Sequence, residues 1–417
     1  MKKIIIEGGV PLRGIVTAGG AKNAVLPVIA ASLLTDGISH IDGAPWLADV
    51  DTMCCALKYM GVDSNYQDGT LSVNSAGLSR FEAPEELVRM MRASFLIMGP
   101  VLAKRGQVKM PLPGGCAIGS RPIDLHLKGF EALGAKIKME KGCIEATANK
   151  LTGARIYLDF PSVGATENLM MAATLAQGTT FIENVAEEPE IVDLANFLGA
   201  MGAKIKGAGT KIIRIEGVKE LKPVRHMVIP DRVEIGTFMA AAVATGGTII
   251  IDNVIEEHLK AVFAKLEETG ATIDENYGTI RVGAGEKILA ADVKTMPYPG
   301  FPTDMQAQIM ALLTRAEGTS IVFETIFENR FMHVGELRKM GADITIDGHS
   351  AVVRGVPRLS GASVEATDLR AGGAMIIAAL AAEGITEITQ IQHIERGYEN
   401  ICEKFASLGA KIKIVDC

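Results

Sequence analysis

The segment Leu133-Gly-Ala-Lys-Ile-Lys138 contains the motif that repeats along this chain. Nearly the same residues occur at 201–206 and 408–413. A glycine that follows a helix-like run and precedes a strand-like run occurs at three further positions. In each copy the glycine ends a helix-like run and a strand-like run follows, which is typical of a left-handed helix C-cap. The gaps between these glycines are 73, 68, 68, 71 and 68 residues, and the six are Gly61, Gly134, Gly202, Gly270, Gly341 and Gly409.

A second feature has the same rhythm. Runs rich in alanine and other apolar residues end at Gly37, Gly106, Gly178, Gly247, Gly318 and Gly384. Their apolar residues go nearly all the way round a helix, so these helices are expected to be buried on most sides. Each unit of about seventy residues then comprises a buried helix, a strand, an amphipathic helix and further strands.

Six such units predict an α/β fold of two similar domains, each with three βαβ-type units around buried helices, an inside-out α/β barrel. The first domain is expected at 22–229 and carries the Cys116 loop. The second is expected at 1–21 plus 230–417 and carries Asp304, with the active site in the cleft between the two. The first strand, residues 3–6, is expected to pair within the second domain. A generic α/β solenoid is the alternative.

The composition of the chain argues against several classes of function. The net charge is −7 and aromatic residues make up 5% of the chain, which argues against nucleic-acid binding. The six cysteines form no CxxC pair and no metal-like grouping with histidine, so no metal site is expected. No run approaches the ~20 apolar residues of a membrane span, and the N-terminus lacks a signal peptide. We therefore expect a cytoplasmic protein, a monomer or weak oligomer, that binds neither membrane nor nucleic acid.

The stretch from Pro111 to His126 is the strongest candidate for chemistry. It joins a predicted strand at 107–110 to a predicted helix at 123–133, and its glycines let a ligand approach the backbone closely. Cys116 lies near Arg121 and the start of that helix, a setting that favours a reactive thiolate. The alternative is a surface loop with an incidental thiol.

Each buried helix also begins with charged residues. Lys22 and Arg92 add positive charge where the helix N-terminus is already positive, so an anion from outside is expected there. Together with Arg121 and Arg396 they favour a polyanionic ligand. The alternative for any one of them is an ion pair with an aspartate or glutamate across the gap between the domains.

These motifs resemble those of the enolpyruvyl transferases, in particular the group that acts on UDP-N-acetylglucosamine. The resemblance covers essentially the whole chain, and its most specific part is the cysteine loop. The matching segments begin at Gly20, Met91, Pro113, Arg121, Ser162, Pro302, Glu328, Asp368 and Arg396.

The resemblance implies transfer of the enolpyruvyl group of phosphoenolpyruvate to the sugar 3′-hydroxyl of UDP-N-acetylglucosamine, with release of phosphate, at the start of peptidoglycan synthesis. It also implies that the reaction requires no metal or organic cofactor. It implies that Asp304 is the general base and that Cys116 delivers a proton to C3 or forms a phosphothioketal adduct with phosphoenolpyruvate. Lys22 is expected to be catalytic and, with Arg92, Arg121 and Arg396, to bind phosphoenolpyruvate. The remaining substrate-binding residues implied are Asn23, Pro122, Ile123, Asp124, Leu125, Ser162, Val163, Gly164, Ile326, Arg330 and Arg370.

Two places depart from the pattern of that group. Residues 44–49 stand where a lysine beside the nucleotide is common, and Gly372-Gly373 stand where serine is common. A sister activity on shikimate 3-phosphate, a catalytically silent UDP-sugar-binding paralogue and an interaction scaffold are the alternatives. The Cys116 loop and Asn23 argue against the activity on shikimate 3-phosphate. The presence of every expected reacting residue argues against a silent paralogue, and the charges at the starts of the buried helices argue against a scaffold.

Overall fold

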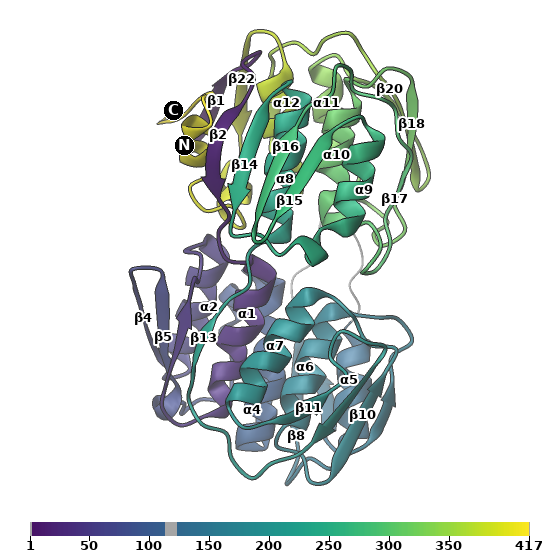
Figure 1. Cartoon of the computed structure of the whole chain (residues 1–417). Helices are drawn as coiled ribbons and strands as arrows, with labels where there is room; N and C mark the ends of the chain where they lie inside the picture. Colours follow the sequence, from purple (N-terminus) through teal and green to yellow (C-terminus); the bar gives the residue numbers. More distant parts are fainter. Residues whose placement is uncertain (1, 113–122, 417) are drawn as a thin grey trace. The chain divides into compact units, whose positions relative to one another are not determined.

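The structure, a computed structural model, describes residues 2–112 and 123–416 (Figure 1). Among them, residues 20–112 and 123–229 form one compact unit, called here the Lys22 unit. Residues 2–19 and 230–416 form a second, the Asp304 unit. Cys116, Arg121 and Pro122 lie outside the described residues.

The Lys22 unit is built around helices that are buried on nearly every side. In α1 (Lys22–Ala31) every residue except Asn23 is buried. The other central helices are α4 (Met98–Arg105), which continues from the 3-10 helix η3 (Arg92–Ile97), and α6 (Val163–Ala173). Apolar residues around the whole helix produce this arrangement, because only a helix enclosed by other elements can hide all of them.

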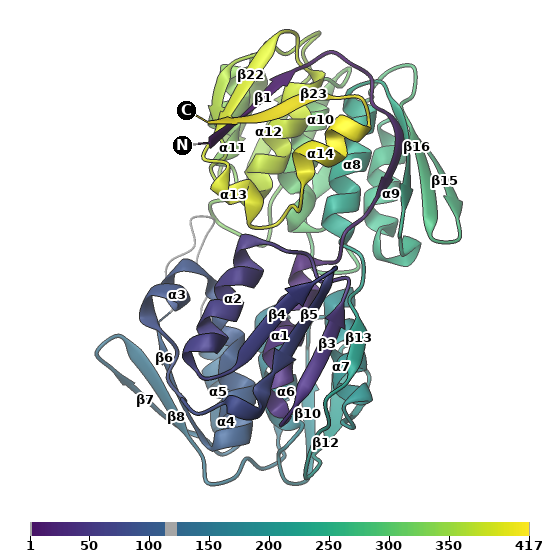
Figure 2. The same cartoon turned by 90° about the vertical axis from the view of Figure 1, so that its left-hand side faces the viewer.

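Three sheets enclose these helices, with strand orders β13-β3-β5-β4, β6-β8-β7 and β11-β12-β10-β9 (Figure 2). Their strands are β3 (Ile38–Asp42), β4 (Asp63–Gln67), β5 (Thr70–Asn74), β6 (Gln107–Pro111), β7 (Lys136–Glu140), β8 (Cys143–Thr147), β9 (Arg155–Tyr157), β10 (Thr179–Glu183), β11 (Lys204–Lys206), β12 (Ile212–Glu216) and β13 (Arg225–Met227). The unit's other helices are η1 (Ser32–Leu34), α2 (Ala48–Tyr59), η2 (Ser75–Gly77), α3 (Glu85–Met90), α5 (Asp124–Ala132) and α7 (Pro189–Ala200).

The Asp304 unit has the same plan, with central helices α8 (Arg232–Ala244), α10 (Gln306–Leu313) and α12 (Leu369–Ala381) (Figure 1). Its sheets have the orders β15-β16-β14-β2, β17-β18-β20-β19 and β21-β22-β1-β23. The strands are β1 (Lys2–Glu7), β2 (Arg13–Thr17), β14 (Thr248–Asp252), β15 (Thr272–Asn276), β16 (Thr279–Gly283), β17 (Val293–Lys294), β18 (Thr319–Phe323), β19 (Asp343–Asp347), β20 (Ser350–Arg354), β21 (Ser363–Glu365), β22 (Ile385–Thr389) and β23 (Lys411–Asp416). The other helices are η4 (Glu256–His258), α9 (Lys260–Glu268), η5 (Thr303–Met305), α11 (His333–Lys339), α13 (Gln392–Glu395) and α14 (Ile401–Ser407).

The N-terminal strand completes the last repeat. β1 lies between β22 and β23 and is antiparallel to both, with Ile4 opposite Ile388 and Ile414 (Figure 2). In the other two sheets of this unit the equivalent place is taken by β16 and β20, which come from the same repeat as their neighbours. The expected pairing of residues 3–6 with the C-terminal half is therefore confirmed.

The glycines of the repeat adopt the expected conformation. The φ angles of Gly61, Gly134, Gly202, Gly270, Gly341 and Gly409 lie between 90° and 109°. Each ends a helix and lets the chain turn into a strand, because a side chain at such a φ is strained. The predicted α/β fold of repeated units around buried helices is confirmed.

Candidate functional site

Asp304 is held by two arginines in the Asp304 unit. Its Oδ1 accepts a hydrogen bond from Arg330 Nη2 at 2.8 Å, and its Oδ2 accepts from Arg370 Nη2 at 2.9 Å and from Nε at 3.2 Å. The arginine side chains are only 4% exposed, whereas that of Asp304 is 26% exposed. The carboxylate is therefore the member of this cluster that solvent or a ligand reaches most easily.

The arginines decide the charge of Asp304. Burial acts to raise the pKa of its carboxyl, but the positive charges of Arg370 and Arg330 outweigh burial and hold that pKa well below its usual value. Burial acts to lower the pKa of Arg370, and Asp304 more than reverses this. Asp304 is thus a permanently ionised carboxylate of low basicity.

Polar side chains next to this cluster link the three central helices α8, α10 and α12. Gln308 Nε2 donates to the Asp304 carbonyl at 2.8 Å and lies within 3.3 Å of Tyr398 OH and 3.4 Å of Thr237 Oγ1. The guanidinium of Arg370 lies 5.7 Å from the centre of the Tyr398 ring. Because α8, α10 and α12 each contribute a residue, the position of Asp304 is fixed by all three helices.

Lys22, at the start of α1, is paired within its own unit. Its Nζ lies 2.6 Å from Asp49 Oδ2, and the two side chains are 9% and 6% exposed. This carboxylate partner belongs to the neighbouring helix α2. Sequence reasoning missed Asp49, because an acid in the first turn of a helix is explained by the helix dipole alone.

A buried amide joins the other helix starts of the Lys22 unit. Asn168 Nδ2 donates to the Phe95 carbonyl at 2.9 Å and lies 3.1 Å from His126 Nδ1, while its Oδ1 accepts from Gly99 N at 2.6 Å. Burial, and secondarily Arg92, lower the pKa of His126 to about 3, so its ring is neutral. His126 is therefore a neutral ring within a buried hydrogen-bonded network.

The remaining expected site residues are distributed over both units. Ser162 caps α6, its Oγ accepting from Ala165 N at 3.3 Å, and Asn23 is exposed in the first turn of α1. Near the start of α5, Ile123 is half-buried, Asp124 exposed and Leu125 buried. The other half-buried members of the set are Arg92, Ser162, Val163, Gly164, Ile326 and Arg396.

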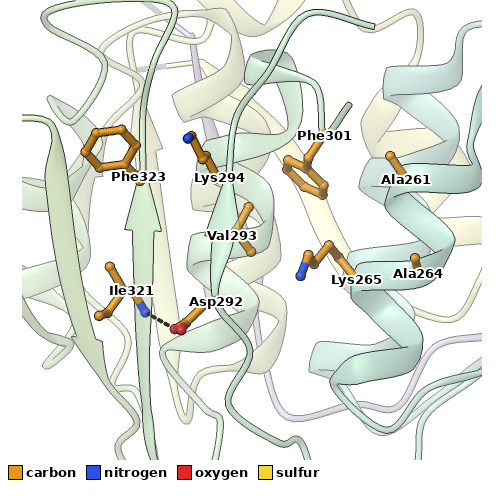
Figure 3. Close-up of a pocket in the computed structure, with 9 residues that line it drawn as sticks. All are labelled: Ala261, Ala264, Lys265, Asp292, Val293, Lys294, Phe301, Ile321 and Phe323. Carbon is orange, nitrogen blue, oxygen red and sulfur yellow. Dashed lines mark hydrogen bonds between the residues drawn. The ribbon is translucent and has the colours of Figure 1, made fainter. Parts of the chain in front are cut away.

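One pocket of about 420 Å³ lies elsewhere on the Asp304 unit (Figure 3). It is formed by α9, β17, β18 and Phe301, with Lys265 and Lys294 at its sides. The carboxylate of Asp292 accepts a hydrogen bond from Ile321 N at 2.8 Å there. No residue expected from the sequence to bind substrate lines this pocket.

Two classes of site find no support in the part of the chain that the structure describes. Residues 2–112 and 123–416 contain no group of histidine, cysteine and acidic side chains that could hold a metal ion. Within the same ranges, none of the helices has the length and apolar character needed to cross a membrane.

Comparison with known proteins assigns the family. The family model described as EPSP synthase (3-phosphoshikimate 1-carboxyvinyltransferase) matches residues 6–405. A UDP-N-acetylglucosamine 1-carboxyvinyltransferase 1 of Caldanaerobacter subterraneus subsp. tengcongensis is 59% identical over 98% of this chain and 99% of its own. The corresponding protein 2 of Carboxydothermus hydrogenoformans is 59% identical over all of both chains, and that of Halothermothrix orenii is 57% identical over all of both chains. The chain belongs to the UDP-N-acetylglucosamine 1-carboxyvinyltransferase family of enolpyruvyl transferases.

Solved structures agree with this family at the level of the fold. The enolpyruvyl transferase NikO from Streptomyces tendae has a TM-score of 0.89 at 24% identity, over all of this chain and 99% of its own. An EPSP synthase from Acinetobacter baumannii has a TM-score of 0.76 at 19% identity, over all of both chains. The family's two-unit fold is thus retained at identities far below those of the UDP-N-acetylglucosamine relatives.

Proposed function

We propose that this protein transfers the enolpyruvyl group of phosphoenolpyruvate to the 3′-hydroxyl of UDP-N-acetylglucosamine and releases phosphate, at the first committed step of peptidoglycan synthesis. The observation that carries the proposal is 57–59% identity to three such transferases over 98–100% of the chain. The shikimate enzyme whose fold it shares is only 19% identical. That difference favours the UDP-sugar as acceptor.

The reaction is proposed to run by addition and elimination. The sugar oxygen bonds to C2 of phosphoenolpyruvate while C3 gains a proton, and the resulting ketal then loses phosphate and a C3 proton. Asp304 is proposed to take the hydroxyl proton. A carboxylate paired with two arginines is a weak base, so the transfer is expected late, when bonding to C2 has made that proton acidic.

Cations are proposed to bind the anionic donor. Arg92, Arg121, Arg396 and Lys22 would meet the phosphate and carboxylate of phosphoenolpyruvate, as the resemblance implies. Lys22 already has a carboxylate partner in Asp49, so an incoming anion must share or replace it. Arg330 and Arg370 are proposed to keep Asp304 ionised and in place.

The other proposed contacts concern the acceptor and the loop. Residues 123–125 and 162–164 are proposed to bind the nucleotide, and Asn23 and Ile326 the sugar. Cys116 is proposed to protonate C3 or to form the adduct with phosphoenolpyruvate. Because these residues belong to both units, the proposed reaction requires both units to engage the same ligands.

The test is phosphate release from phosphoenolpyruvate with UDP-N-acetylglucosamine and, in parallel, with shikimate 3-phosphate. Release with the UDP-sugar alone is expected, and Cys116→Ser should reduce it or change its pH dependence. Release with shikimate 3-phosphate alone would move the protein to the sister activity. Silence with both acceptors, with UDP-sugar binding retained, would replace the catalytic proposal with a regulatory one.

A further inference from the structure

Glu324 is a buried carboxylate that the proposed mechanism does not use. It directly follows β18, is 1% exposed, and accepts four hydrogen bonds. Its Oε1 accepts from Thr295 Oγ1 at 2.9 Å and from the backbone N–H groups of Ile326 and Phe327 at 2.8 and 3.2 Å. Its Oε2 accepts from Thr303 Oγ1 at 2.9 Å. One carboxylate thus holds both the 326–327 backbone and the residue before Asp304.

The bonds continue from Thr303 to Asp304. Arg330 Nη1 donates to Thr303 Oγ1 at 2.8 Å, while Nη2 of the same guanidinium donates to Asp304 Oδ1 at 2.8 Å. An uninterrupted series of contacts therefore leads from the Ile326 backbone through Glu324, Thr303 and Arg330 to the Asp304 carboxylate. All of these residues belong to the Asp304 unit.

The chemistry of each group fixes the direction of these bonds. A guanidinium can only donate, so the oxygen of Thr303 accepts from Arg330 and its one hydroxyl hydrogen is directed at Glu324. The oxygen of Thr303 is then left with lone pairs only, which suits the guanidinium of Arg330. Burial strengthens this preference, because water cannot substitute for a lost partner. Replacing the carboxylate by an amide would place an N–H donor where Thr303 needs an acceptor, or where the backbone N–H groups do.

We propose that Glu324 is a positioning residue that ties the sugar-side backbone at Ile326 to the orientation of Arg330 and Asp304. The proposal rests on the proposed function, in which Ile326 contacts the sugar and Asp304 takes its hydroxyl proton. Glu324 touches neither substrate. It sets the distance between the segment that holds the sugar and the carboxylate that acts on it.

The experiment compares three variants by steady-state kinetics of phosphate release. Glu324→Gln is expected to lower kcat about tenfold and to raise KM for UDP-N-acetylglucosamine severalfold, because both ends of the series lose their orientation. Thr303→Val is expected to lower kcat with little change in that KM, since the Glu324 bonds to residues 326 and 327 remain. Thr303→Ser keeps the hydroxyl and should recover most of the kcat that valine loses.

Glu317→Gln is the matched control, since Glu317 lies just before the same strand but is exposed and forms an ion pair with Lys287. Unchanged kcat and KM in Glu324→Gln, with a lowered melting temperature, would overturn the proposal and leave a purely structural role. If that variant does not fold, equal kcat in the valine and serine variants of Thr303 would overturn it instead. An inactive wild type would refute the proposed function itself.

Discussion

The two units pair the buried charges near their central helices in different ratios. In the Lys22 unit one lysine is matched by one aspartate, and Glu167 and Glu190 are also buried, in the second turn of α6 and the first turn of α7. In the Asp304 unit one carboxylate serves two arginines. A helix N-terminus favours carboxylates, so Lys22 at the start of α1 and Arg370 at the start of α12 both oppose the dipole, and each is paired with a carboxylate.

This difference shows which residues are unusual for their position. Arg370 lies in the first turn of α12, where positive charge is unfavourable, and it is stabilised there by Asp304. Asp368 offsets part of the cost by accepting the backbone N–H groups of Arg370 and Ala371. A buried arginine at such a place therefore depends on the carboxylate of Asp304.

The largest effect is expected where the carboxylate between the arginines is removed. Asp304→Asn should lower kcat by about 10²–10⁴-fold, because an amide cannot take the hydroxyl proton. Phosphate release measures the loss. Asp343→Asn, at an exposed carboxylate 3.4 Å from Arg354, is the control and should behave as wild type. Activity within tenfold of wild type in Asp304→Asn would show that another group is the base.

The Lys22–Asp49 pair of the other unit can be tested by substituting its aspartate. Asp49→Asn leaves Lys22 buried without its carboxylate and should lower the free energy of unfolding by about 3 kcal/mol. Inorganic phosphate should restore part of this stability, because an anion can occupy the vacated place. Urea unfolding with and without phosphate measures both effects.

Asp51→Asn is the control for this comparison, since Asp51 is exposed in the same first turn of α2. If phosphate stabilises the Asp49 variant no more than wild type, Lys22 does not belong to an anion site. The difference in buried charge between the two units would then reflect packing alone and not an anion site.

The buried acids of the Lys22 unit should make its stability depend on pH. Burial, followed by the charges of Glu190 and Glu188, raises the pKa of Glu167 well above its usual value. A raised folded-state pKa favours folding below the ordinary glutamate pKa of about 4.5, and this contribution is lost as pH rises through the folded-state value. Glu167→Gln should therefore gain about 1–2 kcal/mol over wild type at pH 8 and nothing near pH 4.

Melting temperatures between pH 4 and pH 8 measure this gain. Glu187→Gln, at a half-exposed neighbour, should show no such trend. A gain for Glu167→Gln that is the same at every pH would mean that the substitution acts through packing and not through charge.

The smallest effect is expected at the helix-ending glycines, which occur in both units. Gly202→Ala and Gly409→Ala should each lower the free energy of unfolding by about 1 kcal/mol, because alanine at φ 109° or 90° is strained although its Cβ has open space. Gly199→Ala, inside α7 with equal space, should be neutral or stabilising. Unequal costs at the two caps, measured by urea unfolding, would show that the repeats differ in more than their helix starts.

Much of the fold could be predicted because repeated local signals specify it. The six cap glycines and the all-round apolar helices recur at nearly constant spacing, and each depends only on nearby residues. The expected pairing of residues 3–6 with the C-terminal half is not local in this sense, because the partner strands lie at the other end of the chain. The individual site contacts could not be predicted in this way. Asp49 resembles an ordinary helix-start acid, and Glu324 resembles an ordinary residue after a strand.

The sequence by itself determined the repeat, the buried helices and the family, because helix and strand periodicity and cap chemistry are encoded within short segments. Only the tertiary structure decided which charges meet. The pairing of Lys22 with Asp49, and of Asp304 with Arg330 and Arg370, joins residues that lie on different helices or up to 66 positions apart. Such partners are selected when packing excludes water and a buried charge must find its complement within a few ångströms.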